Sequence, residues 1–259
     1  AQMRAMGGVG IALRNYGQIN PVNPAAASIA PQKSFLFDVG FDATHYRNSQ
    51  LKYDAQGAVV APEAMAVYNG ANIHSISLVF PLAKRMGFSF AISPYSSVGY
   101  NIKTTEQNED VWADIGRVRY GHNGEGDISE VKLSYGWAPW QRLSFGIAAK
   151  YYWGGVTRNY QAVAVDVVTG SGVYASTKGT DRYVVNNIKF QLGVQWNPIE
   201  TENRILTVGA TYDFGGELSP KRESYIYTDD IINSIKPNPV RDKISGLELR
   251  VPHQLGVGI

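Results

Sequence analysis

The chain has 259 residues, and its 24 basic and 22 acidic side chains give a formal net charge of +2. This balance excludes a nucleic-acid binder that relies on a broad basic surface. The absence of cysteine excludes disulfides, thiolate zinc sites and a cysteine nucleophile.

Residues 1–32 differ from the rest of the chain. Met6 to Leu13 is rich in glycine, and Asn20 to Ala27 holds two Asn-Pro pairs, which interrupt any regular element. No strand pattern precedes the glycines and no Gly-Lys-Ser/Thr follows them, so a phosphate-binding loop is not indicated. We predict an irregular or briefly helical segment that packs closely against another part of the molecule.

Residues 33–259 alternate between apolar and polar side chains in nine short segments. These segments are 35–43, 76–80, 88–92, 131–137, 143–153, 187–196, 206–212, 247–251 and 255–259. Because successive side chains of a strand point to opposite faces, each segment predicts a strand with one apolar face. The clearest strand, 187–196, has the length that a tilted strand needs to cross a bilayer.

The expected connections alternate between short and long. Short turns fall at 83–85, 138–141, 198–203 and 252–254, and long polar connections at 48–71, 103–125, 166–182 and 216–243. Outer-membrane barrels sort their loops in this way, with tight periplasmic turns and extended outer loops. Trp137 and Trp196 lie beside short turns, and Trp153 lies ten residues beyond Leu143. These positions are typical of the two aromatic belts of a membrane barrel.

The predicted fold is therefore all-β, an antiparallel transmembrane β-barrel formed by residues 33–259, with residues 1–32 as a small N-terminal plug. No run of 18 apolar residues predicts a membrane helix. Nine strands are visible, whereas bacterial single-chain barrels have an even number. We expect C-terminal strands beyond Ile259 to complete the wall.

Two stretches near the N-terminus carry a resemblance to a known family. Arg4 to Ala12, followed by Asn23 to Ala26, resembles the amino terminus of FadL-like outer-membrane proteins, which transport fatty acids and other hydrophobic molecules. The resemblance implies a fourteen-stranded barrel in the outer membrane of a Gram-negative bacterium. It also implies a plug, or hatch, motif made of Gly7, Gly8, Gly10, Asn23, Pro24 and Ala25. Related barrels serve as subunits of type IX secretion or outer-membrane assembly machines.

Charged side chains are predicted on the lumen face of the barrel. Lys150, Lys189 and Arg250 are candidate contacts for an anionic headgroup, such as a fatty-acid carboxylate; the alternative is that lumen charges pair with each other or with the plug. The sequence has neither an HExxH motif nor a Gly-x-Ser-x-Gly elbow. We therefore expect no catalytic residue, no metal site and no cofactor.

Three hypotheses follow for the function. The first is passive transport of small hydrophobic molecules through a plugged barrel. The second is a non-transporting subunit, docked to other outer-membrane proteins of a larger secretion or assembly machine. The third is a soluble β-sandwich. The first two place outer-membrane lipid around the barrel, and none involves nucleic acid.

Overall fold

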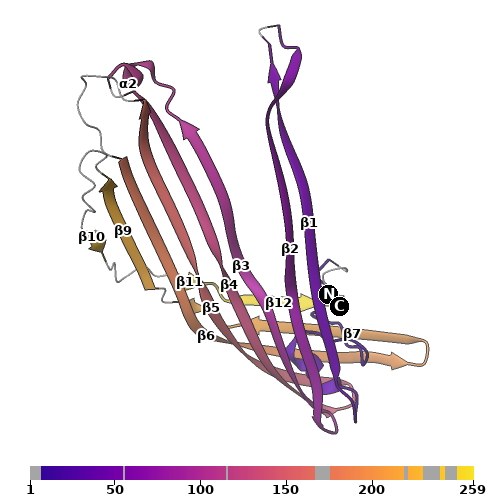
Figure 1. Cartoon of the computed structure of the whole chain (residues 1–259). Helices are drawn as coiled ribbons and strands as arrows, with labels where there is room; N and C mark the ends of the chain where they lie inside the picture. Colours follow the sequence, from indigo (N-terminus) through magenta and orange to yellow (C-terminus); the bar gives the residue numbers. More distant parts are fainter. Residues whose placement is uncertain are drawn as a thin grey trace.

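A computed structural model describes residues 7–54, 56–114, 116–166, 176–218, 221–229, 240–242 and 250–259. These residues form an all-β structure in which every strand pair is antiparallel. One ten-stranded sheet follows the order β1-β2-β3-β4-β5-β6-β7-β12 (Figure 1). In addition, β9 pairs with β6 and β10 pairs with β9, and β8 pairs with β11 in a separate sheet.

The strands fall into two classes, long and short. The long ones are β1 (Leu36–Tyr53), β2 (Val59–Ala83), β3 (Met86–Thr105), β4 (Arg117–Trp140), β5 (Leu143–Asp166) and β6 (Ser176–Thr201). The shorter ones are β7 (Arg204–Asp213), β8 (Gly216–Glu217), β9 (Lys221–Asp229), β10 (Val240–Asp242), β11 (Arg250–Val251) and β12 (Gln254–Gly258).

The predicted long connections at 48–71 and 103–125 are wrong, because most of their residues belong to strands. β1 and β2 are joined by residues 54–58 alone, and β3 and β4 by residues 106–116. The outer parts of these strands lack a sustained alternation of apolar and polar side chains, as in Val59-Val60-Ala61-Pro62 of β2, although backbone pairing continues. The predicted strand at 247–251 is described only as β11, since residues 243–249 lie outside the described part of the chain.

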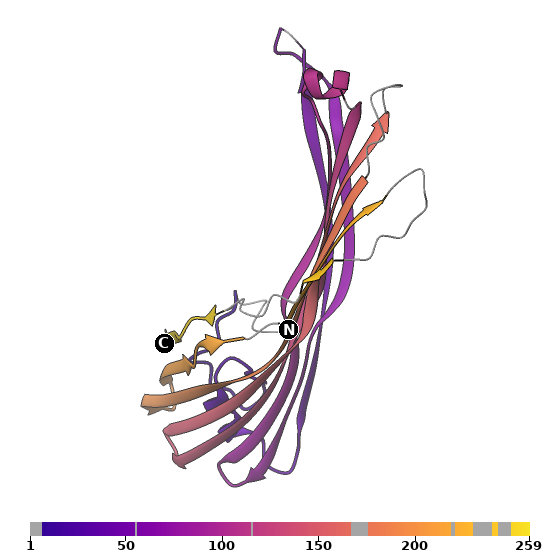
Figure 2. The ribbon, with the colours of Figure 1, turned by 90° about the vertical axis from the view of Figure 1, so that its left-hand side faces the viewer.

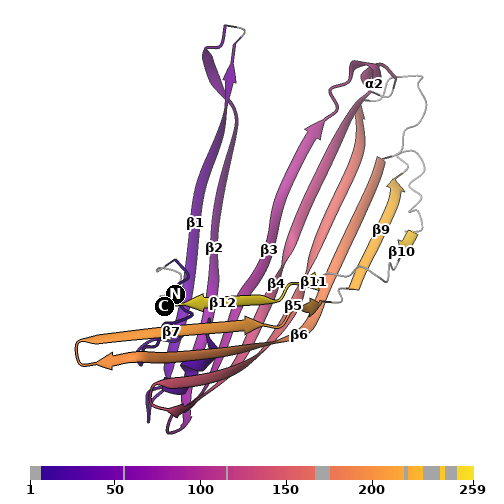
Figure 3. The same ribbon diagram turned by 180° about the vertical axis from the view of Figure 1, so that it is seen from behind.

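The described strands do not close into a barrel. The sequence predicted a closed wall only with strands beyond Ile259, so the closed barrel and its fourteen strands stay a prediction. β1 and β12 are the two edges of the main strand order. β2 pairs with β3 only between Ile76 and Ala83, and the two hairpins diverge above this level (Figure 3). Register shifts at Gly40/Phe41 and at Pro94/Ser96 lie near the point of divergence.

The sheet has an exposed apolar face and a buried polar face, as the alternation predicted. On β4, Leu133 and Tyr135 are 41% and 37% exposed, whereas Lys132 and Ser134 are 5% and 2% exposed. The same inversion holds on β6, where Gln195 is fully buried. A soluble sandwich would bury the apolar face instead.

The N-terminal segment, residues 7–35, lies inside the bend of the lower half of the sheet (Figure 2). Its one regular element is the 3₁₀ helix η1 (Pro24–Ile29), which contacts β2, β3, β4, β5 and β6. The helix begins as capping rules predict, with Asn23 as N-cap and proline at its first position.

The connection between β3 and β4 carries the short helix α2 (Glu109–Asp114). Before it, the Glu106 carboxylate accepts hydrogen bonds from the backbone N–H groups of Asn108 and Gln107 at 3.1 and 2.9 Å. These donors favour the charged carboxylate and lower the pKa of Glu106 below its ordinary value of 4.5.

Candidate functional site

A row of glycines crosses four strands where the N-terminal segment lies. The members are direct cross-strand partners, and we call them the glycine row: Gly87, Gly136, Gly146 and Gly193. A Cβ atom added at Gly146 would lie 2.2 Å from the backbone nitrogen of Ala25, and one at Gly87 would lie 1.9 Å from the carbonyl oxygen of Ala27. The missing side chains therefore let the backbone of the segment rest directly on the sheet.

Asn23 fastens the segment to the sheet through its buried side chain. Its Nδ2 donates to the carbonyl oxygens of Ile11 at 2.8 Å and Val194 at 3.1 Å, and lies 3.4 Å from that of Ala210. Its Oδ1 accepts the N–H of Ala25 at 3.0 Å, which caps η1. One amide thus connects the helix start, the preceding loop and the sheet.

Two further amides hold the loop before η1. Gln195 Nε2 donates from the floor of the sheet to the carbonyl oxygens of Ile11 and Leu13, both at 3.1 Å. Asn20 Nδ2 donates to those of Gly10 and Leu13 at 2.6 and 2.8 Å. Backbone acceptors of an irregular segment are therefore satisfied by side chains, as burial requires.

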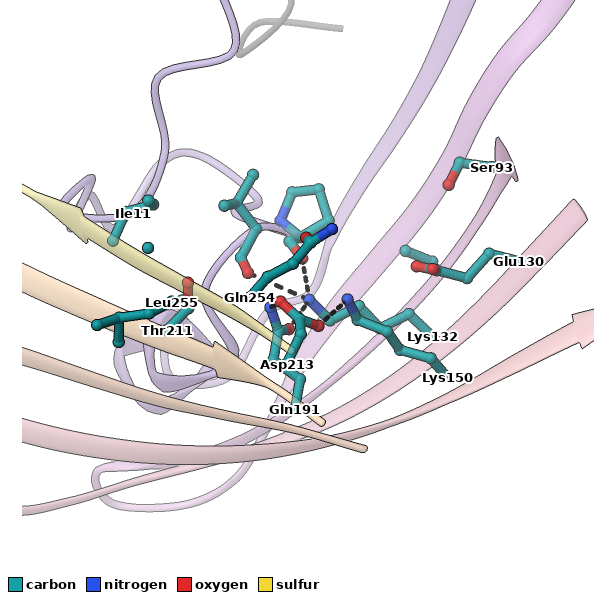
Figure 4. Close-up of a pocket in the computed structure, with 14 residues that line it drawn as sticks. Ile11, Ser93, Glu130, Lys132, Lys150, Gln191, Thr211, Asp213, Gln254 and Leu255 are labelled. Carbon is teal, nitrogen blue, oxygen red and sulfur yellow. Dashed lines mark hydrogen bonds and ion pairs between the residues drawn. The ribbon is translucent and has the colours of Figure 1, made fainter. Parts of the chain in front are cut away.

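A row of lysines runs parallel to the glycine row. Lys132, Lys150 and Lys189 are successive cross-strand partners on β4, β5 and β6. Like charges directly opposite one another are destabilising. Lys132 nevertheless is buried, because its Nζ donates to the carbonyl oxygens of Pro21 and Val22 and to Gln191 Oε1 (Figure 4).

Asp213 supplies a negative charge to this row. Its carboxylate forms an ion pair with Lys150 and accepts a hydrogen bond from Gln191 Nε2 at 2.9 Å (Figure 4). Lys132, Gln191, Asp213 and Lys150 therefore form one connected polar group, and Lys132 ties it to the N-terminal segment. We call these four residues the polar cluster.

A cavity of about 440 Å³ opens beside the polar cluster. Its walls come from the segment, the sheet and β12: Ile11, Pro21 and Val22, the polar cluster, and Gln254 to Gly256 (Figure 4). The charged groups at its edge already bond to protein partners.

The three predicted headgroup contacts lie in two places. Lys150 belongs to the polar cluster, whereas Lys189 Nζ donates to the carbonyl oxygen of Glu217 at 2.8 Å and Arg250 pairs with the Glu217 carboxylate at 3.3 Å. All three contact protein groups, which is the alternative that the sequence left open. A role in holding a ligand stays a prediction.

The predicted hatch residues also separate into two groups. Asn23, Pro24 and Ala25 are buried against the glycine row, and Gly10 is buried next to Asn20. Gly7 and Gly8 adopt left-handed conformations, with φ of 74° and 84°, and nothing lies within 4 Å of an added Cβ. Close backbone approach is therefore a property of the sheet glycines and not of these two.

Comparison with known families gives one match, which covers the polar cluster, the glycine row and the N-terminal segment together. The model of the BamG family matches residues 1–259. The chain belongs to the BamG family. This family is associated with the outer-membrane assembly (BAM) machinery of Gram-negative bacteria. No curated protein and no solved structure matches the chain.

The BamG match changes the interpretation of the N-terminal motif. It supports the assembly-machine branch of the sequence hypotheses better than hydrophobic transport, and the FadL-like assignment gains no specific support from it. Within the described residues, no helix of this BamG family member is long and apolar enough to cross a membrane. No group of three His, Asp or Glu side chains in the same residues could hold a metal ion.

Sequence reasoning missed how the polar cluster of this BamG family member is assembled. Lys132, Gln191 and Asp213 were visible as polar residues on the face opposite the apolar one. Their pairing depends on the register of β4 to β7, which alternation alone does not determine.

Proposed function

We propose that this BamG family member is a non-catalytic subunit of an outer-membrane protein assembly complex. The observation that carries the proposal is the family match over the whole chain. The inverted sheet supports it, because an exposed apolar face with a polar opposite face suits a wall that meets lipid on one side. In this proposal the N-terminal segment braces the sheet from inside.

The contacts of the polar face favour a brace over a passage for solutes. Residues 10–30 contact the backbone of the glycine row and are hydrogen-bonded by the buried side chains of Asn23, Gln195 and Lys132. Lys150, beside the cavity, pairs with Asp213. The cavity has apolar walls from Ile11, Val22 and Leu255, and the charged groups beside them already bond to protein partners.

The open edges of the sheet favour a structure in which other strands pair with them. Unpaired backbone groups at β1 and β12 would be costly in hydrocarbon. We propose that further strands, from this chain or a partner, cover these edges and complete a wall with the fourteen strands that the resemblance implied.

Affinity purification from outer membranes in a mild detergent tests the proposal. The tagged full chain should resist alkaline extraction of the membranes and should then elute in one large complex with the subunits of the assembly machine. A tagged barrel protein of similar abundance and unrelated function serves as the control. Elution of the chain alone, or release by alkaline wash, would contradict the proposal.

A further inference from the structure

The apolar face of the sheet changes character along its length. On β5 and β6 there is no register shift, so one face can be followed from end to end. Its lower residues are exposed and apolar, and we call them the apolar band: Phe145, Ile147, Tyr151, Ile188, Phe190 and Leu192. Beyond Trp153 the same face continues with Thr157, Asn159 and Gln161. The band therefore ends, and a polar surface begins on the same side.

This polar surface consists of two cross-strand rows on β3, β4, β5 and β6. The rows are two residues apart along each strand, so both lie on the same face. We call them the polar platform: Asn101, Asn123, Asn159 and Thr180 in one row, and Lys103, Gly121, Gln161 and Lys178 in the next. The rows line a hollow of about 290 Å³. Gly121 lies under the side chain of Gln161, because a Cβ added there would be 2.8 Å from Gln161 Nε2.

The composition of the platform suits a polyhydroxylated, anionic ligand. Side-chain amides present a donor and an acceptor each, which matches sugar hydroxyl groups. Thr180 Oγ1 donates to Asn159 Oδ1 at 2.8 Å, so this row has a connected hydrogen-bonding surface. Lys103 and Lys178 stand on its outer strands, and neither row contains a carboxylate. The next row toward the band carries Glu125, Arg182 and, on β9, Glu223.

We propose that the polar platform binds the phosphorylated saccharide headgroup of an outer-leaflet glycolipid. Continuity with the apolar band identifies the source, since acyl chains along the band would bring their headgroup to the same face. Asn159 lies six residues beyond Trp153, about 20 Å along the strand, which is the level of a saccharide above the hydrocarbon. The inference rests on the membrane orientation of the proposed function but not on its assembly role.

Calorimetric titration of the full chain, purified in mild detergent, tests the inference. The probe is the phosphorylated core oligosaccharide of a rough-type lipopolysaccharide, freed of its acyl chains, with its dephosphorylated form and inorganic phosphate as comparisons. We expect saturable binding that is strongest for the phosphorylated oligosaccharide. Lys103→Glu should weaken it by about tenfold or more, and Asn123→Ala by several-fold. Lys84→Glu, the same charge change in the turn at the opposite end of the sheet, should leave it unchanged.

Three results would overturn the inference. The first is the absence of saturable binding by the freed oligosaccharide. The second is equal weakening by Lys103→Glu and Lys84→Glu, which would indicate a general charge effect. The third is inorganic phosphate binding as tightly as the oligosaccharide. A chain that binds the oligosaccharide but elutes alone from membranes would support the platform and contradict only the assembly role.

Discussion

A single buried amide joins parts of the molecule that are far apart in the sequence. Asn23 donates to the carbonyl oxygens of Val194 and Ile11 while its oxygen caps η1. Removing one member of such a group leaves several buried polar atoms without partners, which costs more than the net value of the bonds themselves. At the residue scale, the attachment of the N-terminal segment therefore depends on a few amides and one lysine.

Asn23→Ala is expected to lower the free energy of unfolding by about 2–3 kcal/mol, because a helix cap and buried acceptors are lost together. The midpoint of denaturant unfolding in detergent micelles measures the change. Asn48→Ala, an exposed position on β1, is the matched control and should leave the midpoint in place. Equal midpoints for Asn23→Ala and the wild type would contradict the prediction.

The ion pair of the polar cluster should contribute measurably to stability. Lys150 and Asp213 have side chains only 13% and 23% exposed. A double-mutant cycle with Lys150→Met and Asp213→Asn is expected to give a coupling free energy of about 1–2 kcal/mol. The same cycle on the solvent-exposed pair Arg250 and Glu217 should give less than about 0.5 kcal/mol. Similar coupling free energies for the two pairs would show that burial does not strengthen the ion pair between Lys150 and Asp213.

At the scale of elements, the N-terminal segment packs closely against the sheet because the glycine row has no side chains. The glycine row aligns only because β3 to β6 are in the register that makes its members direct partners. A methyl group at any of the four positions would meet segment atoms at 2.4 Å or less. Either the segment or the strand then has to move.

Gly146→Ala is expected to displace the segment and make its half-buried trypsin site at Arg14 more accessible. Limited proteolysis followed by mass spectrometry should detect cleavage there at protease levels that leave the wild type intact. Gly99→Ala is the control, because nothing lies within 4 Å of its added Cβ. Resistance of Gly146→Ala equal to that of Gly99→Ala would mean that the segment is not seated on the row.

At the scale of the whole molecule, the sequence predicted the central strands of the sheet better than the outer parts of the strands. Alternation located β4, β5 and β6 and their two faces, because lipid-height strands need one apolar face. It failed beyond that height, where the alternation is not sustained and β1 and β2 continue by backbone pairing. The glycine row and the partner of Lys150 were not predictable, since each depends on register. Closure of the wall was predicted only with strands beyond Ile259, and the described strands leave β1 and β12 as edges.

The apolar band should determine how the whole molecule sits in a bilayer. Phe190→Lys puts a charge within the band, whereas Asn186→Lys puts the same charge on the same face of β6 just above it. We expect Phe190→Lys to make insertion into lipid vesicles less favourable by about 2–4 kcal/mol, with a small effect for Asn186→Lys. Reversible folding into vesicles measures both. Equal penalties would place the hydrocarbon elsewhere on the sheet.

The contacts of Asn23 also bear on the order in which the molecule takes shape. Its partners on β6 and β7 follow it by 171 and 187 residues, and contacts of such separation form late because a long loop must close first. The segment therefore cannot settle until the strands up to β7 stand side by side. Docking of the segment therefore follows the pairing of β6 with β7, so a stretch early in the sequence takes its final place after strands that come much later in it.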